Sequence, residues 1–288
     1  MSFGNYFLYF EYNRPEFKEE ILRFSADELH YRLYRHGQNV VGHHVDEAVP
    51  KAVSNLLEIT PKTTLKTTKK IGSSGKIFVS IACFCDPDVV HTVNDCLDKA
   101  GSPARVEIGV CLQAEPNDNS YDALNDIAQV TVDRIDVTEA RGPIYARARC
   151  EALMTDADYF LQIDCHSRFF SGWDEILIQE FGKALEFNDN AVLSHYPMNI
   201  KNMTSSDHLD RIGHVNRYRY IEADSIKSHG SLIKLPEMPT TSLGISAAML
   251  FMRAEDRKRF PYDSQLDFGL HAAEQVLYAV RLWTHGFD

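Results

Sequence analysis

The sequence predicts an α/β protein with a largely parallel central sheet. From about residue 77 onward, short runs rich in β-branched and aromatic residues alternate with segments of helical periodicity, the order expected of βαβ units. The chain has 288 residues, of which 44% are hydrophobic and 25% charged, so it can bury a sizeable core. The region before residue 77 has a different character.

The N-terminal region is predicted to be a small helical segment followed by a linker. Between residues 15 and 57, apolar side chains recur near the period of an amphipathic helix. Residues 61–76 are rich in Thr, Lys, Gly and Ser, which is the composition of an exposed connection. We therefore expect a helical segment at 1–60, a linker at 61–76 and an α/β domain at 77–288.

The strands and helices of the α/β domain are predicted from composition and from start signals. Two of the helices open with a proline in their first turn, where its fixed φ favours helix entry. The polar stretch 197–243 is weakly periodic, so we expect an irregular region that forms the acceptor side of a site. We place strands at 77–84, 105–112, 130–137, 159–163, 191–195 and 246–252, and helices at 87–100, 143–154 and 173–187.

Composition excludes several classes of partner. A net charge of −11 disfavours nucleic acid and anionic membrane surfaces. No segment approaches the roughly 20 apolar residues of a membrane span, and the first ten residues lack the features of a secretory signal. The six cysteines show no CxxC spacing and are expected to be reduced thiols. These features predict a cytoplasmic protein with no membrane span.

An apolar strand near the middle of the domain ends in two metal-ligand side chains, Asp164 and His166. In α/β sheets, ligands bind beyond the carboxyl ends of the strands. Extended backbone points side chains i and i+2 the same way, so the two residues can converge on one ion. A carboxylate and an imidazole suit Mn²⁺, which also accepts phosphate oxygens and offsets charge on a leaving diphosphate. The alternative is a turn-capping Asp164 beside an exposed His166.

Three blocks within residues 77–288 resemble a known family. The first is IFVSIACFCDPD at 77–88. The second runs from ARGPIYAR at 140–147 through Asp164-Cys165-His166 to WDE at 173–175, and the third is Glu274 with RLWTHGFD at 281–288. Together they resemble the GlcNAc-transferases whose members are cytoplasmic enzymes that modify hydroxyproline on polypeptides. The second block is also similar to the mucin-type polypeptide GalNAc-transferases.

This resemblance implies a GT-A type fold and a metal-dependent, retaining glycosyltransferase. The expected reaction moves a hexosamine, GlcNAc by preference, from a UDP-sugar to a hydroxyl of a protein or glycan acceptor. The expected cofactor is a divalent cation, Mn²⁺ by preference and Mg²⁺ as the alternative. A competing interpretation is a non-catalytic module of the same fold that binds a nucleotide-sugar or a glycan. Neither a P-loop nor a dinucleotide-binding glycine motif is present in the sequence.

The resemblance also implies roles for residues on the donor side. Asp164 and His166 would bind the metal, and Asp164 would also contact the donor. Ala82 and Phe84 end the first strand, where this fold admits uracil and ribose, and Gln113 ends the next strand and would contact the base. The alternative for Ala82 and Phe84 is a buried strand end.

Two arginines near the start of the helix at 143–154 are further candidates. Arg141 precedes a Gly-Pro turn, so its guanidinium and the helix N-terminus would both face an anionic diphosphate. Its alternative is a surface salt bridge. Arg147 would organise the site by pairing with Asp158 or Asp164.

The acceptor side is expected to use Glu274 as the catalytic acidic residue, which would orient a hydroxyl or stabilise positive charge on the sugar. The sequence around it, AAEQ at 272–275, departs from the family pattern of a glycine and a second acid. His285 is the candidate third metal ligand. Relatives continue past the equivalent of Asp288 with further histidines, so the expected alternative is a domain shortened at its C-terminus. Trp173 and Trp283 are expected to be core aromatics.

Overall fold

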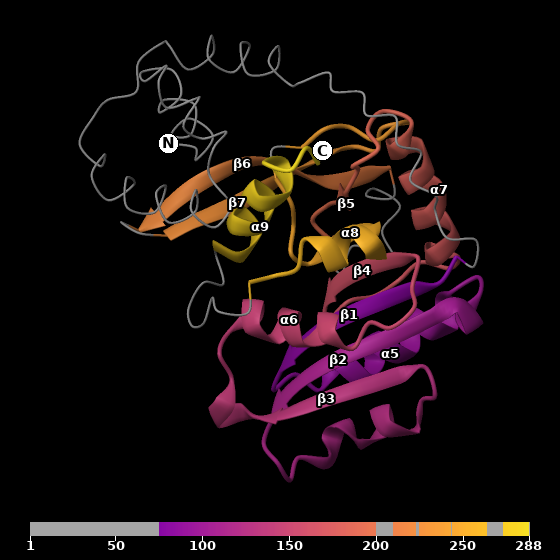
Figure 1. Ribbon diagram of the computed structural model, residues 1–288, viewed down its shortest axis with the longest axis vertical. Coiled ribbons are helices and arrows are strands. Elements are labelled where there is room, and N and C mark those ends of the chain that lie inside the picture. Colours follow the sequence, from indigo (N-terminus) through magenta and orange to yellow (C-terminus); the bar gives the residue numbers. More distant parts are fainter. Residues whose placement is uncertain (1–74, 200–209, 223–224, 243, 264–272, 288) are drawn as a thin grey trace.

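The structure is a computed structural model that describes residues 75–199, 210–222, 225–242, 244–263 and 273–287. Within these residues the chain forms a six-stranded sheet with helices on both faces and a separate two-stranded hairpin (Figure 1). The predicted helical segment at 1–60 and most of the predicted linker lie outside the described residues.

The central sheet has the strand order β3-β2-β1-β4-β8-β5. Strands β1 to β4 pair in parallel, whereas β8 runs antiparallel to both β4 and β5. Each strand lies where the sequence predicts one, with ends that differ by a few residues, so the largely parallel sheet is confirmed. The strands are β1 (Ile77–Phe84), β2 (Val106–Ala114), β3 (Val130–Asp136), β4 (Tyr159–Asp164), β5 (Leu193–Ser194) and β8 (Met249–Arg253).

Helices cover both faces of the sheet. Successive strand residues point to opposite sides, so the apolar strands present apolar side chains on both faces, and helices bury them. In β1, Ile77, Val79 and Ile81 pack with α5 and α7, whereas Phe78 packs with α6 and α9 on the other face. The helices are α5 (Asp88–Lys99), α6 (Pro143–Ala152), α7 (Trp173–Leu185), α8 (Ala254–Arg259) and α9 (Ala273–Trp283), with short 3₁₀ helices η1 (Pro103–Arg105), η2 (Asn119–Asp126) and η3 (Val137–Glu139).

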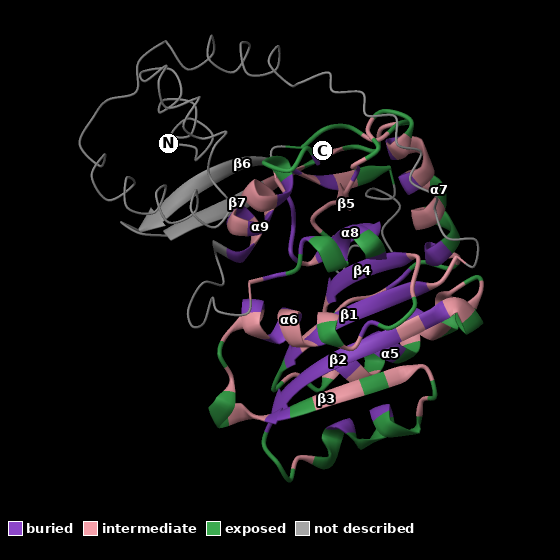
Figure 2. Ribbon diagram, viewed as in Figure 1, coloured by how far each residue is buried: buried purple, intermediate pink, exposed green. Residues whose placement is uncertain are grey.

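Burial follows the position of each strand in the sheet. Figure 2 shows β1, β2 and β4 almost wholly buried, while most residues of the edge strand β3 are half-buried or exposed. The central strands therefore read as near-continuous apolar runs, as expected for parallel strands covered on both faces.

Two helix starts depend on backbone that favours glycine. Gly142 precedes α6 with φ of 89°, and Gly172 precedes α7 with φ of 72°. Residues other than glycine rarely adopt these values, so both glycines set the direction in which the chain enters the helix. Pro143 then begins α6, as the sequence predicts.

The prediction of an irregular region at 197–243 is wrong, because part of it forms a hairpin of β6 (Arg211–Glu222) and β7 (Ser225–Lys234). Figure 1 shows this hairpin beside α9, at the opposite end of the molecule from β3. Tyr196 attaches it, since its backbone N–H donates to Gly213 O (2.9 Å) and its hydroxyl donates to Gln275 Oε1 of α9 (2.9 Å). A Cβ at Gly213 would lie 2.4 Å from the Tyr196 carbonyl oxygen, so only glycine permits this approach.

The described residues contain no helix that is both long and apolar enough to cross a membrane. All six cysteines lie in the described part of the chain, and each is a free thiol. The prediction of reduced cysteines agrees with this arrangement.

Candidate active site

The candidate site forms where the neighbouring strands β1 and β4 end. The two strands pair in parallel with Ala82 opposite Asp164, so the turns that follow them emerge side by side at the carboxyl edge of the sheet. The turn after β1 begins with Cys85 in the left-handed region (φ of 49°), and it delivers Asp86 to the side of His166. This placement joins residues that are about 80 positions apart in the sequence.

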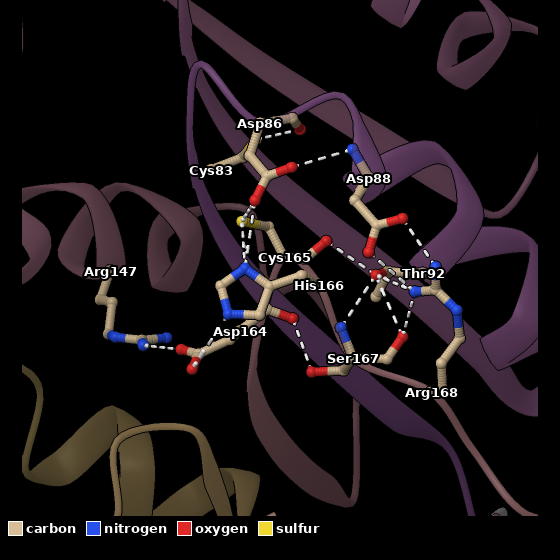
Figure 3. Close-up of polar contacts among 10 residues, drawn as sticks. All are labelled: Cys83, Asp86, Asp88, Thr92, Arg147, Asp164, Cys165, His166, Ser167 and Arg168. Carbon is tan, nitrogen blue, oxygen red and sulfur yellow. Dashed lines mark hydrogen bonds and ion pairs between the residues drawn. The ribbon is translucent and has the colours of Figure 1, made fainter. Parts of the chain in front are cut away.

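His166 lies between two carboxylates (Figure 3). Its Nδ1 is 3.1 Å from Asp86 Oδ2, and its Nε2 is 4.0 Å from Asp164 Oδ2. Burial lowers the pKa of His166, but the hydrogen bond with Asp86 and the effects of Cys165 and Asp164 outweigh it, so the pKa is raised above its ordinary value. The hydrogen bond between Nδ1 and Asp86 fixes the orientation of the ring, with Nε2 facing Asp164.

Asp164 is held on its other side by Arg147 of α6. The guanidinium donates from Nη2 to Asp164 Oδ1 (3.1 Å), from Nη1 to the Ile163 carbonyl (3.2 Å) and from Nε to Glu274 Oε1 (2.5 Å). Burial lowers the pKa of Arg147, but Glu274 and Asp164 raise it by more, so the group stays charged. Of the two predicted partners, Asp158 and Asp164, Arg147 forms an ion pair with Asp164. It forms a second ion pair with Glu274, which was not predicted.

Asp164 and His166 can reach a common divalent ion. An ion bonded to an oxygen and a nitrogen at about 2.0–2.2 Å spans oxygen–nitrogen separations from about 3 Å at a right angle to about 4.4 Å for ligands on opposite sides of the ion. The observed separation of 4.0 Å is at the wide end of this range, so the two side chains would move closer together to bind an ion at a tetrahedral or right angle. A metal-binding histidine usually donates its other ring N–H to a carboxylate, and Asp86 is placed to accept that proton.

A family model supplies the identity of the domain. The glycosyltransferase (GlcNAc) model matches residues 76–128 and 121–288. The chain belongs to this GlcNAc glycosyltransferase family. The predicted α/β fold, with its mostly parallel sheet, is confirmed by the strand order. No curated protein matches the chain in sequence.

Several solved structures are similar to this GlcNAc-family domain, all with low identity. TarS 1-349 of S. aureus shares 11% identity with a TM-score of 0.42, over 71% of this chain and 55% of its own. GalNAc-T7 with UDP, GalNAc and Mn²⁺ shares 13% with a TM-score of 0.48, over 71% and 40%. The mannosyltransferase PcManGT of Pyrobaculum calidifontis, with GDP-Man and Mn²⁺, shares 14% with a TM-score of 0.33, over 43% and 36%. The chain thus spans about half or less of each of these structures.

The donor-side candidates of the GlcNAc-family domain differ in accessibility. Phe84 presents its ring to solvent, with 59% of its surface exposed, and Ala82 is half-buried at the end of β1. Gln113 is buried, and its amide donates to the Cys83 carbonyl (3.2 Å). Its buried Oε1 has no hydrogen-bond partner among the described residues. Arg141 is exposed, and its guanidinium lies 5.3 Å from the ring centroid of Tyr145.

Glu274 and His285 lie at opposite ends of α9. Glu274 is 1% exposed and its carboxylate is engaged by Arg147. His285 follows the helix end, where its Nδ1 contacts the Arg281 carbonyl (2.7 Å) and its ring packs on Phe260. The two residues are separated by roughly 15 Å along the helix axis. Among the described residues, the structure does not bring His285 together with the ligand atoms of Asp164 and His166.

Sequence reasoning missed Asp86 as a partner of His166. The signal was present, because Asp86 lies two residues after the end of β1 and parallel neighbours end at the same edge of a sheet. What the sequence does not give is that β1 and β4 are neighbours, since β2 and β3 lie between them along the chain. Trp173 is buried, as predicted, whereas Trp283 is exposed, so the prediction of a core residue is wrong for Trp283.

Proposed function

We propose that this family member is a metal-dependent, retaining transferase that moves GlcNAc from UDP-GlcNAc to a hydroxyl of a protein or glycan acceptor. The observation that carries the proposal is the arrangement of Asp164 and His166. Their ligand atoms are 4.0 Å apart, and both side chains are held in place from the far side by Arg147 and Asp86. Family membership supports glycosyl transfer as the reaction class.

In this proposal Asp164 and His166 hold the divalent ion, Mn²⁺ by preference and Mg²⁺ as the alternative. When bound, such an ion offsets the negative charge that develops on the departing UDP. Asp86 keeps the imidazole oriented with Nε2 toward the ion, and Arg147 fixes the carboxylate of Asp164. A third ligand from His285 stays a prediction. It would require the His285 ring to leave Phe260, on which it packs in the structure.

The donor would lie beyond the carboxyl ends of β1 and β4. The exposed ring of Phe84 supports a stacking role for a planar base, and the small side chain of Ala82, two residues earlier, lies on the same face of β1. Arg141 and the N-terminus of α6 lie on the same chain segment and favour an anionic diphosphate. Gln113 reaches the base in this proposal through its unpartnered Oε1.

Glu274 would act on catalysis through Arg147. Its carboxylate is almost fully buried and accepts a 2.5 Å hydrogen bond from that guanidinium. For Glu274 to contact the acceptor directly, as predicted, its carboxylate would have to leave Arg147 when the acceptor binds. We propose a positioning role, in which Glu274 holds Arg147 and Arg147 holds Asp164.

The test is UDP release from UDP-GlcNAc with and without Mn²⁺, followed by NMR of the product to read its anomeric configuration. Release should require the metal, stop in excess chelator and fall to background in Asp164→Ala. Asp156→Ala is the control, because this carboxylate is 98% exposed and precedes β4, at the opposite end of the strand from Asp164. Undiminished release in excess chelator contradicts the proposal.

A second candidate is a non-catalytic module that binds a nucleotide-sugar or a glycan. The burial of Glu274 favours it, because this acid does not face solvent in the structure. Calorimetry separates the two, since Mn²⁺-dependent UDP binding with no hydrolysis or transfer across a panel of acceptors supports the module. We further propose that residues 1–60 form a helical segment joined by residues 61–76 to the catalytic domain, and that the protein acts in the cytoplasm.

A further inference from the structure

Three chemically different ligand atoms meet on the Nδ1 side of His166. The distance from Nδ1 to Asp86 Oδ2 is 3.1 Å, from Nδ1 to Cys165 Sγ 3.8 Å, and from Sγ to Asp86 Oδ2 3.7 Å. All three atoms lie within 4.8 Å of one another, and this is the one such group of three among the described residues. Asp164 does not belong to it, because it faces Nε2 on the other side of the ring.

The triangle has nearly the dimensions of one face of a tetrahedral zinc site. With bonds of about 2.3 Å to sulfur, 2.05 Å to nitrogen and 2.1 Å to oxygen, tetrahedral edges are about 3.4 Å for N–O and about 3.6 Å for both N–S and O–S. The observed edges differ from these values by about 0.3 Å or less. Small side-chain rotations would therefore complete the coordination.

Neighbouring hydrogen bonds already hold this triangle in place. Asp86 Oδ1 accepts the backbone N–H of Asp88 (3.0 Å), which leaves Oδ2 directed at the triangle. The Cys165 carbonyl accepts the hydroxyl of Thr92 (2.7 Å), which fixes the backbone beside the thiol. The His166 side chain is 61% exposed, so a water molecule can reach the fourth position.

We propose that Asp86, Cys165 and His166 form a second metal site, specific for a thiophilic divalent ion such as Zn²⁺. Thiolate and imidazole ligands favour Zn²⁺ over Mg²⁺ and Mn²⁺. Binding displaces the thiol proton of Cys165 to solvent, and the ion bonds Sγ, Nδ1 and Oδ2. The carboxylate and the thiolate together balance the charge of the ion.

This site and the proposed donor-metal site exclude each other through the single imidazole. When Nδ1 binds the thiophilic ion, the neutral ring carries its proton on Nε2, and Nε2 can no longer bind a metal beside Asp164. A thiophilic ion is then an inhibitor of donor-metal binding. This consequence rests on the proposed function, whereas binding of the ion does not.

The test of binding uses Co²⁺ as a spectroscopic substitute for Zn²⁺ on the purified full chain. A thiolate ligand gives a sulfur-to-cobalt charge-transfer band in the near ultraviolet, and Zn²⁺ should abolish it by displacement. The band should disappear in Cys165→Ser. It should persist in Cys85→Ser, the control, because Cys85 is exposed and does not belong to the triangle. Asp86→Asn should weaken Co²⁺ binding by about tenfold or more. No band in the wild type, or an unchanged band in Cys165→Ser, overturns the proposal.

A second measurement separates this site from the proposed function. Calorimetric Mn²⁺–UDP binding should be blocked by one equivalent of Zn²⁺ in the wild type and be at least about tenfold less sensitive in Cys165→Ser. If the cobalt band is present but Mn²⁺–UDP binding is absent, the thiophilic site stands and the proposed function fails. If Zn²⁺ leaves Mn²⁺–UDP binding unchanged while the band is present, the exclusion of one site by the other is overturned.

Discussion

At the residue scale, Arg147 is the side chain that links the candidate site to the rest of the domain. It lies on α6 and contacts the end of β4 through Asp164 and the Ile163 carbonyl. Its Nε is bonded to Glu274 at the start of α9. A fork of donors in fixed geometry can make these three contacts at once, whereas a single ammonium cannot. The position of Asp164 therefore depends on arginine at this site.

We expect Arg147→Lys to weaken Mn²⁺–UDP binding by about tenfold or more, because residues that orient a metal ligand have effects of this size. Arg149→Lys is the matched control, since Arg149 lies on the same helix and pairs with Asp133 away from the site. Calorimetry measures both affinities, and circular dichroism checks that each variant is folded. Equal affinities in the two variants would show that Arg147 does not position Asp164.

The sequence predicts the site residues unevenly, and the reason is distance along the chain. Asp164 and His166 are two positions apart on one strand end, so local geometry is enough to pair them. The partnership of His166 with Asp86 requires knowing that β1 and β4 are adjacent. Burial of Glu274 depends on how α9 packs against α6, which no local pattern encodes.

At the element scale, α7 is anchored by a buried carboxylate in its first turn. Asp174 accepts hydrogen bonds from the backbone N–H groups of Gly101 (2.7 Å) and Ser102 (3.1 Å). The guanidinium of Arg105 donates to it from Nε (3.1 Å) and Nη2 (2.9 Å). The Asp174 side chain has no exposed surface. This carboxylate therefore joins α7 to the loop that follows α5.

We predict that Asp174→Asn lowers the free energy of unfolding by about 2–3 kcal/mol, the usual value for hydrogen bonds to a buried charge. Glu175→Gln is the control. The Glu175 carboxylate faces the same arginine at the longer distance of 3.6 Å, and its side chain is 63% exposed. Its effect should stay below about 0.5 kcal/mol. Urea denaturation measures both, and equal effects would contradict the anchoring role.

Acid should remove the contribution of Asp174. Burial raises the pKa of this carboxyl, but hydrogen bonds from Gly101 and Arg105 outweigh it, so the pKa lies below its ordinary value of 3.8. A lowered pKa in the folded state stabilises the fold above pH 3.8, and this contribution is lost as the pH falls through the folded value. The stability difference between the wild type and Asp174→Asn should therefore be constant near neutral pH and shrink below pH 3.8. Urea titrations across this range measure it, and a difference that grows in acid would contradict the assignment.

The elements themselves were predictable where burial imposes a pattern. The central strands are apolar along their length because both faces are covered, so composition marks them clearly. The hairpin of β6 and β7 was missed because its two strands form a sheet of their own, joined to the rest by one bridge at Tyr196, and carry polar residues throughout. A sequence that mixes polar and apolar residues without a continuous apolar run resembles a loop.

At the scale of the whole molecule, two buried ion pairs tie the helices of one face together through α6. Arg147 and Glu151 are one helical turn apart, so they lie on the same side of α6. Arg147 pairs with Glu274 of α9, and Glu151 pairs with Arg257 of α8. The guanidinium of Arg257 also lies 4.2 Å from the ring centroids of both Tyr262 and Tyr278. The packing of α8 and α9 on the sheet thus depends on charges carried by α6.

Arg257→Met tests this dependence, because Arg257 has no exposed surface and its removal leaves Glu151 as a buried, uncompensated charge. Burial already raises the pKa of Glu151 against the opposing effect of Arg257. We expect Arg257→Met to lower the free energy of unfolding by about 3–5 kcal/mol, and Glu151→Gln in the same chain to recover part of this loss by removing the charge. A double-mutant cycle by urea denaturation measures the coupling between the two residues. If the effects of the two substitutions simply add, Glu151 and Arg257 do not stabilise one another, and the aromatic contacts of Arg257 alone account for its burial.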